Sequence, residues 1–200
     1  MATAIVASVP VYDKPDQGDP VQSLDNPSPP YGTPLVFLVR DQEPGWLHVL
    51  LPVRPNGSMG WIRHSDVELT AHDFRILVEL GAHRLTVWQG DTVLATEPIG
   101  IGRDTAPTPP GLYYTRELLQ PSNPDSAYGP YAYGLSGYSE VIFQFSENGV
   151  QGDGRFAIHG TNDPASIGQS QGNGCIRISN EAITKLATTL PIGVPVEIRE

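Results

Sequence analysis

Short apolar runs separated by clusters of Pro, Gly and Asp recur along residues 1–70. This pattern predicts a small β-barrel unit built from short strands and tight turns. The expected strands are residues 5–7, 9–12, 35–39, 46–51 and 60–62. The Asn56-Gly57 pair before the last of them is a strong hairpin signal, because both residue types accept positive φ angles. Residues 16–30, rich in prolines and acids, are expected to form a long first loop.

The pattern restarts near residue 71 without a clear linker, so two closely docked units are expected, 1–70 and 71–200. The expected strands of the second unit are residues 74–80, 84–88, 92–96, 112–115, 141–145, 155–159 and 194–198. One helix is predicted over 181–190, with Asn180 as its N-cap. The segment 120–138, rich in Pro, Gly, Ser and Tyr, is too long for a simple connection, which predicts a mobile wall or lid. The fold class is therefore mainly β.

Composition and charge narrow the possible partners. The chain has 20 Pro and 21 Gly among 200 residues, which favours short strands and turns over long helices. A net charge of −10 argues against a nucleic-acid partner, since phosphate binding needs a Lys/Arg surface. The same charge disfavours adsorption to anionic membranes or wall polymers. Spanning a bilayer takes a run of about 20 apolar residues, and the chain contains no such run. No membrane contact by this chain is therefore expected.

The candidate chemistry centres on Cys175, the single cysteine, which lies in the glycine-rich turn 172–175. A cysteine attacks as the thiolate, and a nearby imidazole is the usual group that takes its proton. His159 ends the apolar run 155–159 and supplies an imidazole. Flanking glycines suit a sharp turn that exposes the sulfur and directs backbone N–H groups at a developing oxyanion. The N–H groups of Gly174 and Cys175 are the candidates for that oxyanion hole.

Two other roles compete for Cys175. A lone cysteine is more often a small buried hydrophobe, but a Gly-x-Gly-Cys turn is expected at the surface, with few apolar neighbours. A zinc site needs further Cys or His ligands at short spacing, and none occurs near Cys175. The sequence therefore favours a nucleophile, and no metal is expected.

Two motifs in residues 72–200 resemble the signature of the L,D-transpeptidase (YkuD-type) catalytic domain. The His159-Gly160 pair, a following loop and the Gly-Cys-Ile-Arg run at 174–177 are similar to the family's His-Gly pair and Ser-x-Gly-Cys-x-Arg run. Upstream, the Pro-Thr-Pro-Pro-Gly-Leu-Tyr run at 107–113 resembles its Thr-Pro-x-Gly-x-Tyr element. The motifs occur in the family's order. The resemblance implies an L,D-transpeptidase β-sandwich domain over residues 71–200.

The resemblance also implies a reaction on the stem peptides of peptidoglycan, in cell-wall biogenesis and cell shape. Cys175 would attack the carbonyl between the stem's diamino acid and its terminal D-residue, release D-Ala and form a thioester. The side-chain amine of a neighbouring stem would then form the cross-link. His159 would move the protons, and the Gly160 carbonyl would accept a hydrogen bond from the imidazole Nδ1–H. No metal or organic cofactor is needed, and carbapenems acylate the family.

Further candidates surround these residues. Arg177 would bind a substrate carboxylate or lower the thiol pKa; bracing the loop through carbonyl hydrogen bonds is the slightly favoured alternative. Asn173, where the family often has His, Lys or Asn, is expected to contact substrate. Substrate contact is also expected from three tyrosines that would line the groove, unless they only pack their loop: Tyr128, Tyr131 and Tyr133.

One position departs from the family pattern. Gly172 stands where the family usually has a serine or threonine, three residues before the nucleophile. Ser170 is the nearest residue that could replace this hydroxyl.

Residues 1–70 resemble a bacterial SH3-like domain through a Val-x-Val-Tyr run, a Gly-Trp-x-x-Val strand and a Gly-Trp-Ile strand. The resemblance implies binding of a peptide or wall ligand; a spacer that packs on the catalytic domain is an equal alternative. Trp46 and Trp61 are expected in the barrel core, and Tyr12 and Tyr31 at its surface. This unit is not expected to carry chemistry.

Two other functions stay open. Water in place of the amine would make the protein an L,D-carboxypeptidase or cysteine peptidase on the same fold. A non-catalytic wall-binding protein is the second, although the intact Cys175, His159 and Arg177 argue against it. The resemblance implies an extracytoplasmic protein of the cell wall or periplasm. The chain starts without a positively charged signal region, so the sequence alone leaves two alternatives: a cytosolic protein, or a mature ectodomain whose export signal is absent from this chain. The resemblance implies the second.

Overall fold

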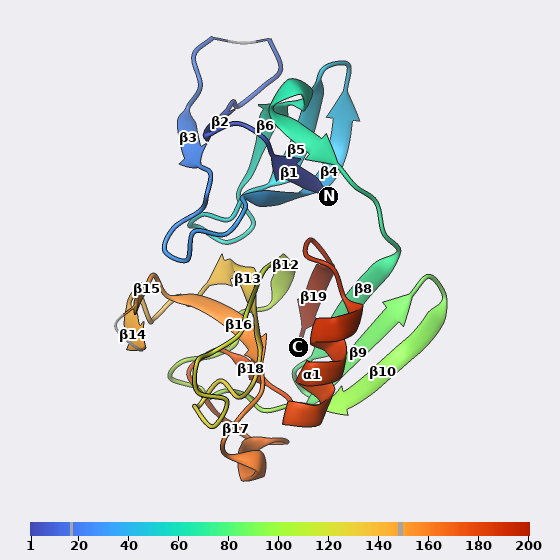
Figure 1. Ribbon diagram of the computed structural model, residues 1–200, viewed down its shortest axis with the longest axis vertical. Helices are drawn as coiled ribbons and strands as arrows, with labels where there is room; N and C mark the ends of the chain where they lie inside the picture. Colours follow the sequence, from blue (N-terminus) through green and yellow to red (C-terminus); the bar gives the residue numbers. More distant parts are fainter. Residues whose placement is uncertain (17, 148–149) are drawn as a thin grey trace.

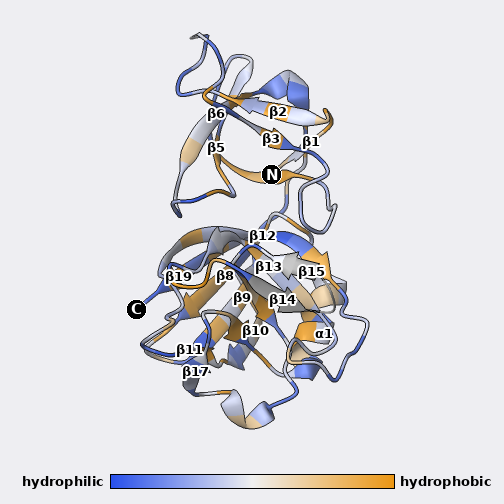
Figure 2. Cartoon of the chain, turned by 90° about the vertical axis from the view of Figure 1, so that its left-hand side faces the viewer, coloured by the Kyte–Doolittle hydropathy of each residue, from blue (hydrophilic) through white to orange (hydrophobic). Residues whose placement is uncertain are grey.

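The computed structural model describes residues 1–16, 18–147 and 150–200, and these ranges form a mainly β protein with a single α-helix. Its two units follow one another along the long axis, the N-terminal unit at the top of Figure 1. Hydrophobic stretches lie along the strands of both units (Figure 2). The predicted mainly β fold class is confirmed. No helix in the described ranges is long and apolar enough to cross a membrane.

The N-terminal unit is a five-stranded sheet in the order β6-β5-β4-β1-β7, accompanied by a β2–β3 hairpin. The bounds are β1 Ala2–Ala4, β2 Ser8–Val11, β3 Gln22–Asp25, β4 Val36–Glu43, β5 Trp46–Leu50, β6 Met59–Arg63 and β7 Val67–Leu69, with a 3₁₀ turn at His64–Asp66. Its core is separate and includes Phe37, Leu47 and Ile62. The SH3-like assignment and the boundary at residue 70 stay predictions.

Four details of this unit differ from the sequence-based expectations. The predicted strand at residues 5–7 is not observed, because β1 covers Ala2–Ala4 and Ile5 is exposed. Trp61 is half-buried rather than in the core, and its ring stacks on His48 with centroids 4.7 Å apart. The predicted long first loop contains β3, because the turn after β2 brings residues 22–25 back onto that strand. Tyr12 is buried rather than at the surface, and its ring packs edge-on against Trp46 with centroids 5.0 Å apart.

The C-terminal unit contains an eight-stranded sheet in the order β10-β9-β8-β19-β12-β13-β16-β18. Its strands are β8 Phe74–Glu79, β9 Arg84–Gln89, β10 Thr92–Pro98, β12 Gly111–Leu119, β13 Ala132–Tyr138, β16 Arg155–His159, β18 Ile176–Arg177 and β19 Pro195–Arg199. Two small ladders join β11 Ile101–Gly102 to β17 Ser170–Gly172, and β14 Phe145–Glu147 to β15 Val150–Gly152. A 3₁₀ turn spans Pro164–Ser166, and the helix α1 spans Asn180–Thr189.

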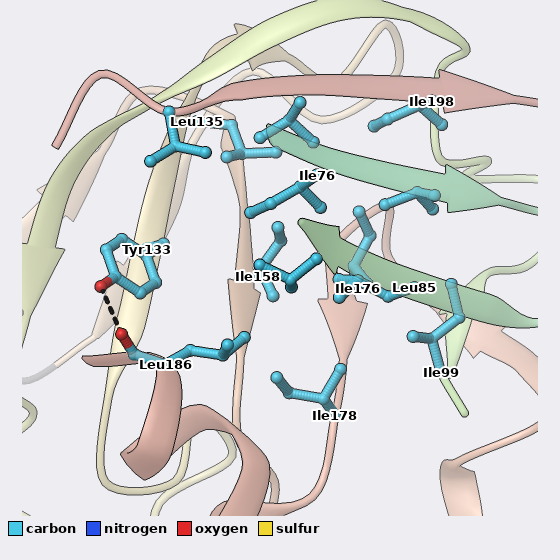
Figure 3. Packing of buried hydrophobic residues seen from close by; sticks show 14 of the residues in the cluster. Ile76, Leu85, Ile99, Tyr133, Leu135, Ile158, Ile176, Ile178, Leu186 and Ile198 are labelled. Carbon is cyan, nitrogen blue, oxygen red and sulfur yellow. Dashed lines mark hydrogen bonds between the residues drawn. The ribbon is translucent and has the colours of Figure 1, made fainter. Parts of the chain in front are cut away.

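The long strand β12 connects the two halves of this sheet. Its first residues pair with β19, whereas those after a bulge near Thr115 pair with β13. The two halves and the buried face of α1 enclose one large apolar core, part of which is shown in Figure 3. Because close-packed interiors resist small displacements, this core fixes the positions of the strands that carry the candidate site.

Three local predictions for this unit are wrong. The second half of segment 120–138 is β13, a strand buried along its whole length, so only residues 120–131 form a loop. Residues 141–144 form no strand, and β14 begins at residue 145. The N-cap of α1 is Ser179 rather than Asn180, because the Ser179 Oγ accepts a 3.1 Å hydrogen bond from the Ala182 N–H.

Candidate active site

Two adjacent parallel strands bring Cys175 and His159 to the same face of the sheet. In the ladder of β16 and β18, Ile158 lies opposite Ile176 and His159 opposite Arg177, and Cys175 directly precedes β18. Side chains alternate between the two faces of a strand. Ile158 and Ile176 are buried in the core, where Figure 3 shows them close together. His159 lies on the opposite face, and Cys175, one residue before β18, has the same parity as Arg177. Cys175 is half-buried and also packs against the edge of the apolar core, so the turn is less exposed than the sequence suggested.

The imidazole of His159 is held in one tautomer. Its Nδ1 lies 2.5 Å from the Gly160 carbonyl oxygen, and because a carbonyl only accepts, Nδ1 carries the proton. Nε2 is left as the nitrogen that can accept a proton. The ring is 4% exposed, and burial lowers the His159 pKa to about 4; the Gly160 hydrogen bond opposes this shift, whereas the charge of Arg177 adds to it. At neutral pH the imidazole is therefore an uncharged base.

The turn before Cys175 requires glycine. Gly174 has a φ of +104°, which L-residues with a side chain rarely adopt, and a Cβ there would lie 3.3 Å from the Pro107 carbonyl oxygen. The Gly174 N–H has no acceptor among the described residues, so it is available to a ligand. This geometry is compatible with the predicted oxyanion hole, which stays a prediction.

The second motif, at 107–113, braces this turn from behind. Thr108 is buried, and its Oγ1 accepts a 3.0 Å hydrogen bond from the Gly102 N–H. Gly102 pairs in turn with Gly172 in the β11–β17 ladder. At the other end of the motif, the Tyr113 hydroxyl donates to the Pro109 carbonyl at 3.1 Å. The motif therefore supports the strand that leads into the turn at Cys175.

Close backbone packing explains the glycine at position 172. A Cβ on Gly172 would lie 2.9 Å from the Ile101 carbonyl oxygen, and the Gly172 carbonyl accepts a 3.0 Å bond from Arg103 N–H. Ser170 does not replace the missing hydroxyl, because its exposed Oγ lies 3.4 Å from His83 Nε2. The turn is thus shaped by backbone contacts.

The two polar candidates beside Cys175 differ in their partners. The half-buried Arg177 side chain has no hydrogen bond or ion pair to any described residue, so the favoured bracing role is not observed. Its backbone N–H donates to the Gly100 carbonyl at 2.8 Å, which fixes its position. Asn173 is exposed, and its Oδ1 accepts a hydrogen bond from Arg103. The Arg177 guanidinium is therefore the better placed of the two for a substrate carboxylate.

The three candidate tyrosines separate into different environments. The Tyr128 ring centroid lies 4.7 Å from that of His159, and Tyr128 lines the cavity that contains Cys175. Tyr131 contributes its backbone, whose carbonyl accepts the Gly160 N–H at 3.3 Å. Tyr133 does not line the groove, because it is buried and its hydroxyl donates to carbonyls of the helix segment, including Leu186 at 3.1 Å (Figure 3). We retain only Tyr128 as a candidate substrate contact.

A close contact between glycines, not anticipated from the sequence, positions the loop at 120–131. A Cβ on Gly129 would lie 2.8 Å from the Gly160 Cα, so the loop packs directly on the His-Gly pair. Asn180 supports this contact, because its Oδ1 accepts a 2.8 Å hydrogen bond from the Thr161 N–H. The pairing of Gly129 with Gly160 has no signal in local sequence, since thirty residues separate them.

Cys175 opens into a cavity of about 270 Å³. The lining is Tyr31, Glu117, Leu119, Gln120, Pro121, Ser122, Tyr128, Ala132, Gly134, Arg155, Phe156, Ala157 and Cys175. Most of it comes from the loop at 120–131 and from strands β12, β13 and β16, but Tyr31 belongs to the N-terminal unit. Tyr31 was expected only at the surface of the N-terminal unit, with no role at the site. Within the described ranges, no group of three or more His, Cys, Asp or Glu side chains is placed to hold a metal ion.

Comparisons with known proteins identify the family. The family model of the L,D-transpeptidase catalytic domain (YkuD) matches residues 73–198. The chain is 34% identical over 125 residues to the YkuD protein of Bacillus subtilis (strain 168), and 31% identical over 125 residues to that of Bacillus licheniformis. Each alignment covers 62% of this chain and 65% of the relative, so the chain spans about two thirds of the relatives' length.

A solved structure shows the same fold. It is L,D-transpeptidase 3 from Mycobacterium tuberculosis in complex with a faropenem-derived adduct, with a TM-score of 0.52 and 15% identity, over 82% of this chain and 79% of that one. The two motifs and the strand register at Cys175 and His159 agree with the family match over residues 73–198. The chain therefore belongs to the YkuD-type L,D-transpeptidase family.

Proposed function

We propose that the protein is a peptidoglycan L,D-transpeptidase that uses Cys175 as its nucleophile and His159 as its general base. The observation that carries the proposal is the register of β16 and β18, which places both side chains on one face beside a cavity. The fixed Nδ1–H tautomer supports it, because Nε2 is then free of its own proton. Burial keeps the imidazole uncharged at neutral pH, which is the form that a base requires.

The proposed reaction has two half-reactions. His159 Nε2 takes the Cys175 thiol proton as the sulfur attacks the stem-peptide carbonyl, and backbone N–H groups of the turn stabilise the oxyanion. The C–N bond then breaks, His159 returns the proton to the departing D-Ala amine, and a thioester remains. The side-chain amine of a second stem attacks the thioester and loses its proton to His159, the C–S bond breaks, and His159 returns this proton to the departing Cys175 sulfur, which restores the thiol. No metal or organic cofactor takes part.

Other residues have supporting roles in this proposal. The Gly160 carbonyl, which already accepts the Nδ1–H hydrogen bond, stabilises the imidazolium formed during the reaction. Arg177 offers its guanidinium to a donor carboxylate. The N-terminal unit would add contacts to peptidoglycan or another wall ligand, and the protein would act outside the cytoplasm in the wall or periplasm.

Intact-mass analysis tests the function directly. Incubation with a tetrapeptide stem that ends in D-Ala should add one acyl mass to the wild-type protein, located on the peptide that contains Cys175. The Cys175→Ala variant should gain no mass and produce no cross-link. Addition of a second stem with a free side-chain amine should give a cross-linked dimer in preference to hydrolysed donor. Hydrolysis alone would point to a carboxypeptidase, and absence of an adduct would contradict the proposal.

A carbapenem provides a second test that is independent of the stem peptide. The compound should form one covalent adduct on Cys175 and none on Cys175→Ala, because this is the single cysteine of the chain.

A further inference from the structure

The segment 28–33 of the N-terminal unit forms a closed turn with Tyr31 at its tip. The Ser28 N–H donates to the Thr33 carbonyl at 2.7 Å, and the Gly32 N–H donates to the Ser28 carbonyl at 3.0 Å. Asn26 fixes the base of the turn, because its Nδ2 donates to the Val6 carbonyl and its Oδ1 accepts from the Leu35 N–H, each at 3.0 Å. The turn is therefore held rigidly to its own unit.

Buried charged groups fasten the same turn to the catalytic unit. Arg155 forms an ion pair with Glu117 at 3.2 Å, and the two side chains are only 5% and 2% exposed. Arg155 Nη2 also donates to the Pro29 carbonyl at 2.6 Å, and the Thr33 hydroxyl donates to Glu117 Oε2 at 2.9 Å. The remaining Arg155 nitrogen, Nε, donates to Asp153 at 2.9 Å. Both Glu117 oxygens and all three Arg155 nitrogens therefore have hydrogen-bond partners, so the network holds the turn in one position.

This attachment places Tyr31 in the lining of the cavity that contains Cys175 and Tyr128. The two charged residues of that lining, Glu117 and Arg155, are committed to each other and to the turn. The rest of the lining is largely apolar, with Leu119, Pro121, Ala132, Phe156 and Ala157. Such a cavity suits an uncharged aliphatic segment held between aromatic rings rather than a charged group.

We propose that Tyr31, together with Tyr128, forms the aromatic wall of the acyl-donor subsite, so the N-terminal unit completes the substrate-binding site. The proposal rests on the proposed transpeptidase function and names what this unit contributes to it. The group bound is an uncharged aliphatic part of the donor peptide next to the carbonyl that Cys175 attacks. Glu117 and Arg155 are positioning residues that act through the turn.

Acylation measured against donor concentration tests this wall. Tyr31→Ala should raise the tetrapeptide concentration for half-maximal acylation about tenfold, as expected for loss of an aromatic contact, while the maximal rate changes much less. Tyr31→Phe keeps the ring and should recover most of the donor affinity that Tyr31→Ala loses. Trp61→Ala is the matched control, because Trp61 is a half-exposed aromatic residue of the same unit that stacks on His48 and does not line the cavity. Thermal melts confirm that each variant is folded.

Alkylation of Cys175 gives a readout that needs no enzymatic activity. Opening the wall should let a bulky maleimide react severalfold faster with Tyr31→Ala than with the wild type, whereas small iodoacetamide should react at the same rate with both. If neither the alkylation ratio nor the half-maximal donor concentration changes, Tyr31 is not a wall of the site and the inference is overturned. If the wild type forms no thioester, the transpeptidase proposal fails, and the alkylation ratio alone decides whether Tyr31 shields Cys175.

Discussion

The strands next to Cys175 and His159 and the junction between the two units are held in place by different forces. The strands β16 and β18 lie on a large apolar core, and Ile158 and Ile176 are almost fully buried in it. At the junction, the buried apolar cluster is small and is formed by Val36, Leu50 and Tyr114. Non-directional burial over a large area therefore sets the geometry of the Cys–His pair.

Directional polar contacts hold the junction instead. Arg54 Nη1 donates to the Ser139 carbonyl at 2.6 Å, Asn56 exchanges two 2.8 Å hydrogen bonds with the Tyr138 backbone, and the Tyr138 hydroxyl donates to the Pro52 carbonyl at 2.8 Å. Hydrogen bonds contribute modestly to stability but fix orientation. Changes at the junction should therefore alter the cavity wall, whereas changes at the strands should alter the chemistry itself.

The largest expected effect comes from removing the base. His159→Ala should slow acylation by a tetrapeptide donor by about 10²–10⁴-fold at pH 7, the usual contribution of general acid–base catalysis. Stopped reactions analysed by intact mass give the rate. His48→Ala, which changes a histidine stacked on Trp61 in the N-terminal unit, should acylate like the wild type. An unchanged rate in a folded His159→Ala protein would rule out the assigned role.

Breaking the buried ion pair should have the next largest effect, and it acts on the junction. Arg155→Met leaves the Glu117 carboxylate buried without its ion-pair partner, which should lower the free energy of unfolding by about 3–5 kcal/mol. The matched control is Arg84→Met, because the Arg84–Glu79 pair is 49% and 29% exposed.

Solvent screens such exposed pairs, so Arg84→Met should cost only about 1 kcal/mol or less. Urea unfolding measures both variants. Equal losses of stability would show that the buried network does not hold the junction as described.

Sequence patterns predicted that the segments of Cys175 and His159 lie together, because the signals in these segments are local. The alternation in the run 155–159, the glycines around Cys175 and the motif at 107–113 each depend on near neighbours, and the structure brings these segments together. The general fold class was accessible for the same reason, since short strands and turn residues show in composition and periodicity.

Long-range contacts account for what the sequence did not reveal. Tyr31 reaches the cavity through a turn anchored to Arg155, a residue more than one hundred positions later in the chain. Tyr133 lies in the core because β13 is a central strand, although its glycines and tyrosines are typical of a loop. Neither fact has a signature within a short window, because tertiary packing overrides local propensity there.

A third prediction concerns the core-held region, where the buried His159 should make the stability of the protein depend on pH. Its pKa is lowered from 6.5 to about 4 by burial, so below pH 6.5 the unfolded chain binds a proton that the folded protein does not. Stability should therefore fall between about pH 6.5 and pH 4, by about 3 kcal/mol from this group, and the loss should level off below pH 4.

Urea unfolding at pH 7 and pH 4 tests this effect. His159→Ala should lose about 3 kcal/mol less than the wild type over this interval, whereas Cys175→Ala, which keeps His159, should retain the wild-type dependence. Identical pH dependence in all three proteins would mean that His159 is not buried in its neutral form.

The smallest expected effect isolates one polar contact of the junction. Asn56→Ala removes both hydrogen bonds to the Tyr138 backbone and should lower the free energy of unfolding by about 1–3 kcal/mol, because it leaves buried backbone groups unpaired. Asn123→Ala is the control, since Asn123 is exposed and its side chain bonds only to its own loop. Asn56 lies far along the chain from Cys175, and its side chain bonds to Tyr138 on β13 rather than to β16 or β18. A looser junction should therefore raise the half-maximal donor concentration through Tyr31, while the iodoacetamide reactivity of Cys175 stays at the wild-type value. If Asn56→Ala lowered that intrinsic thiol reactivity as well, the junction would act on the Cys–His pair itself, and the division between a core-held site and a hydrogen-bonded wall would not hold.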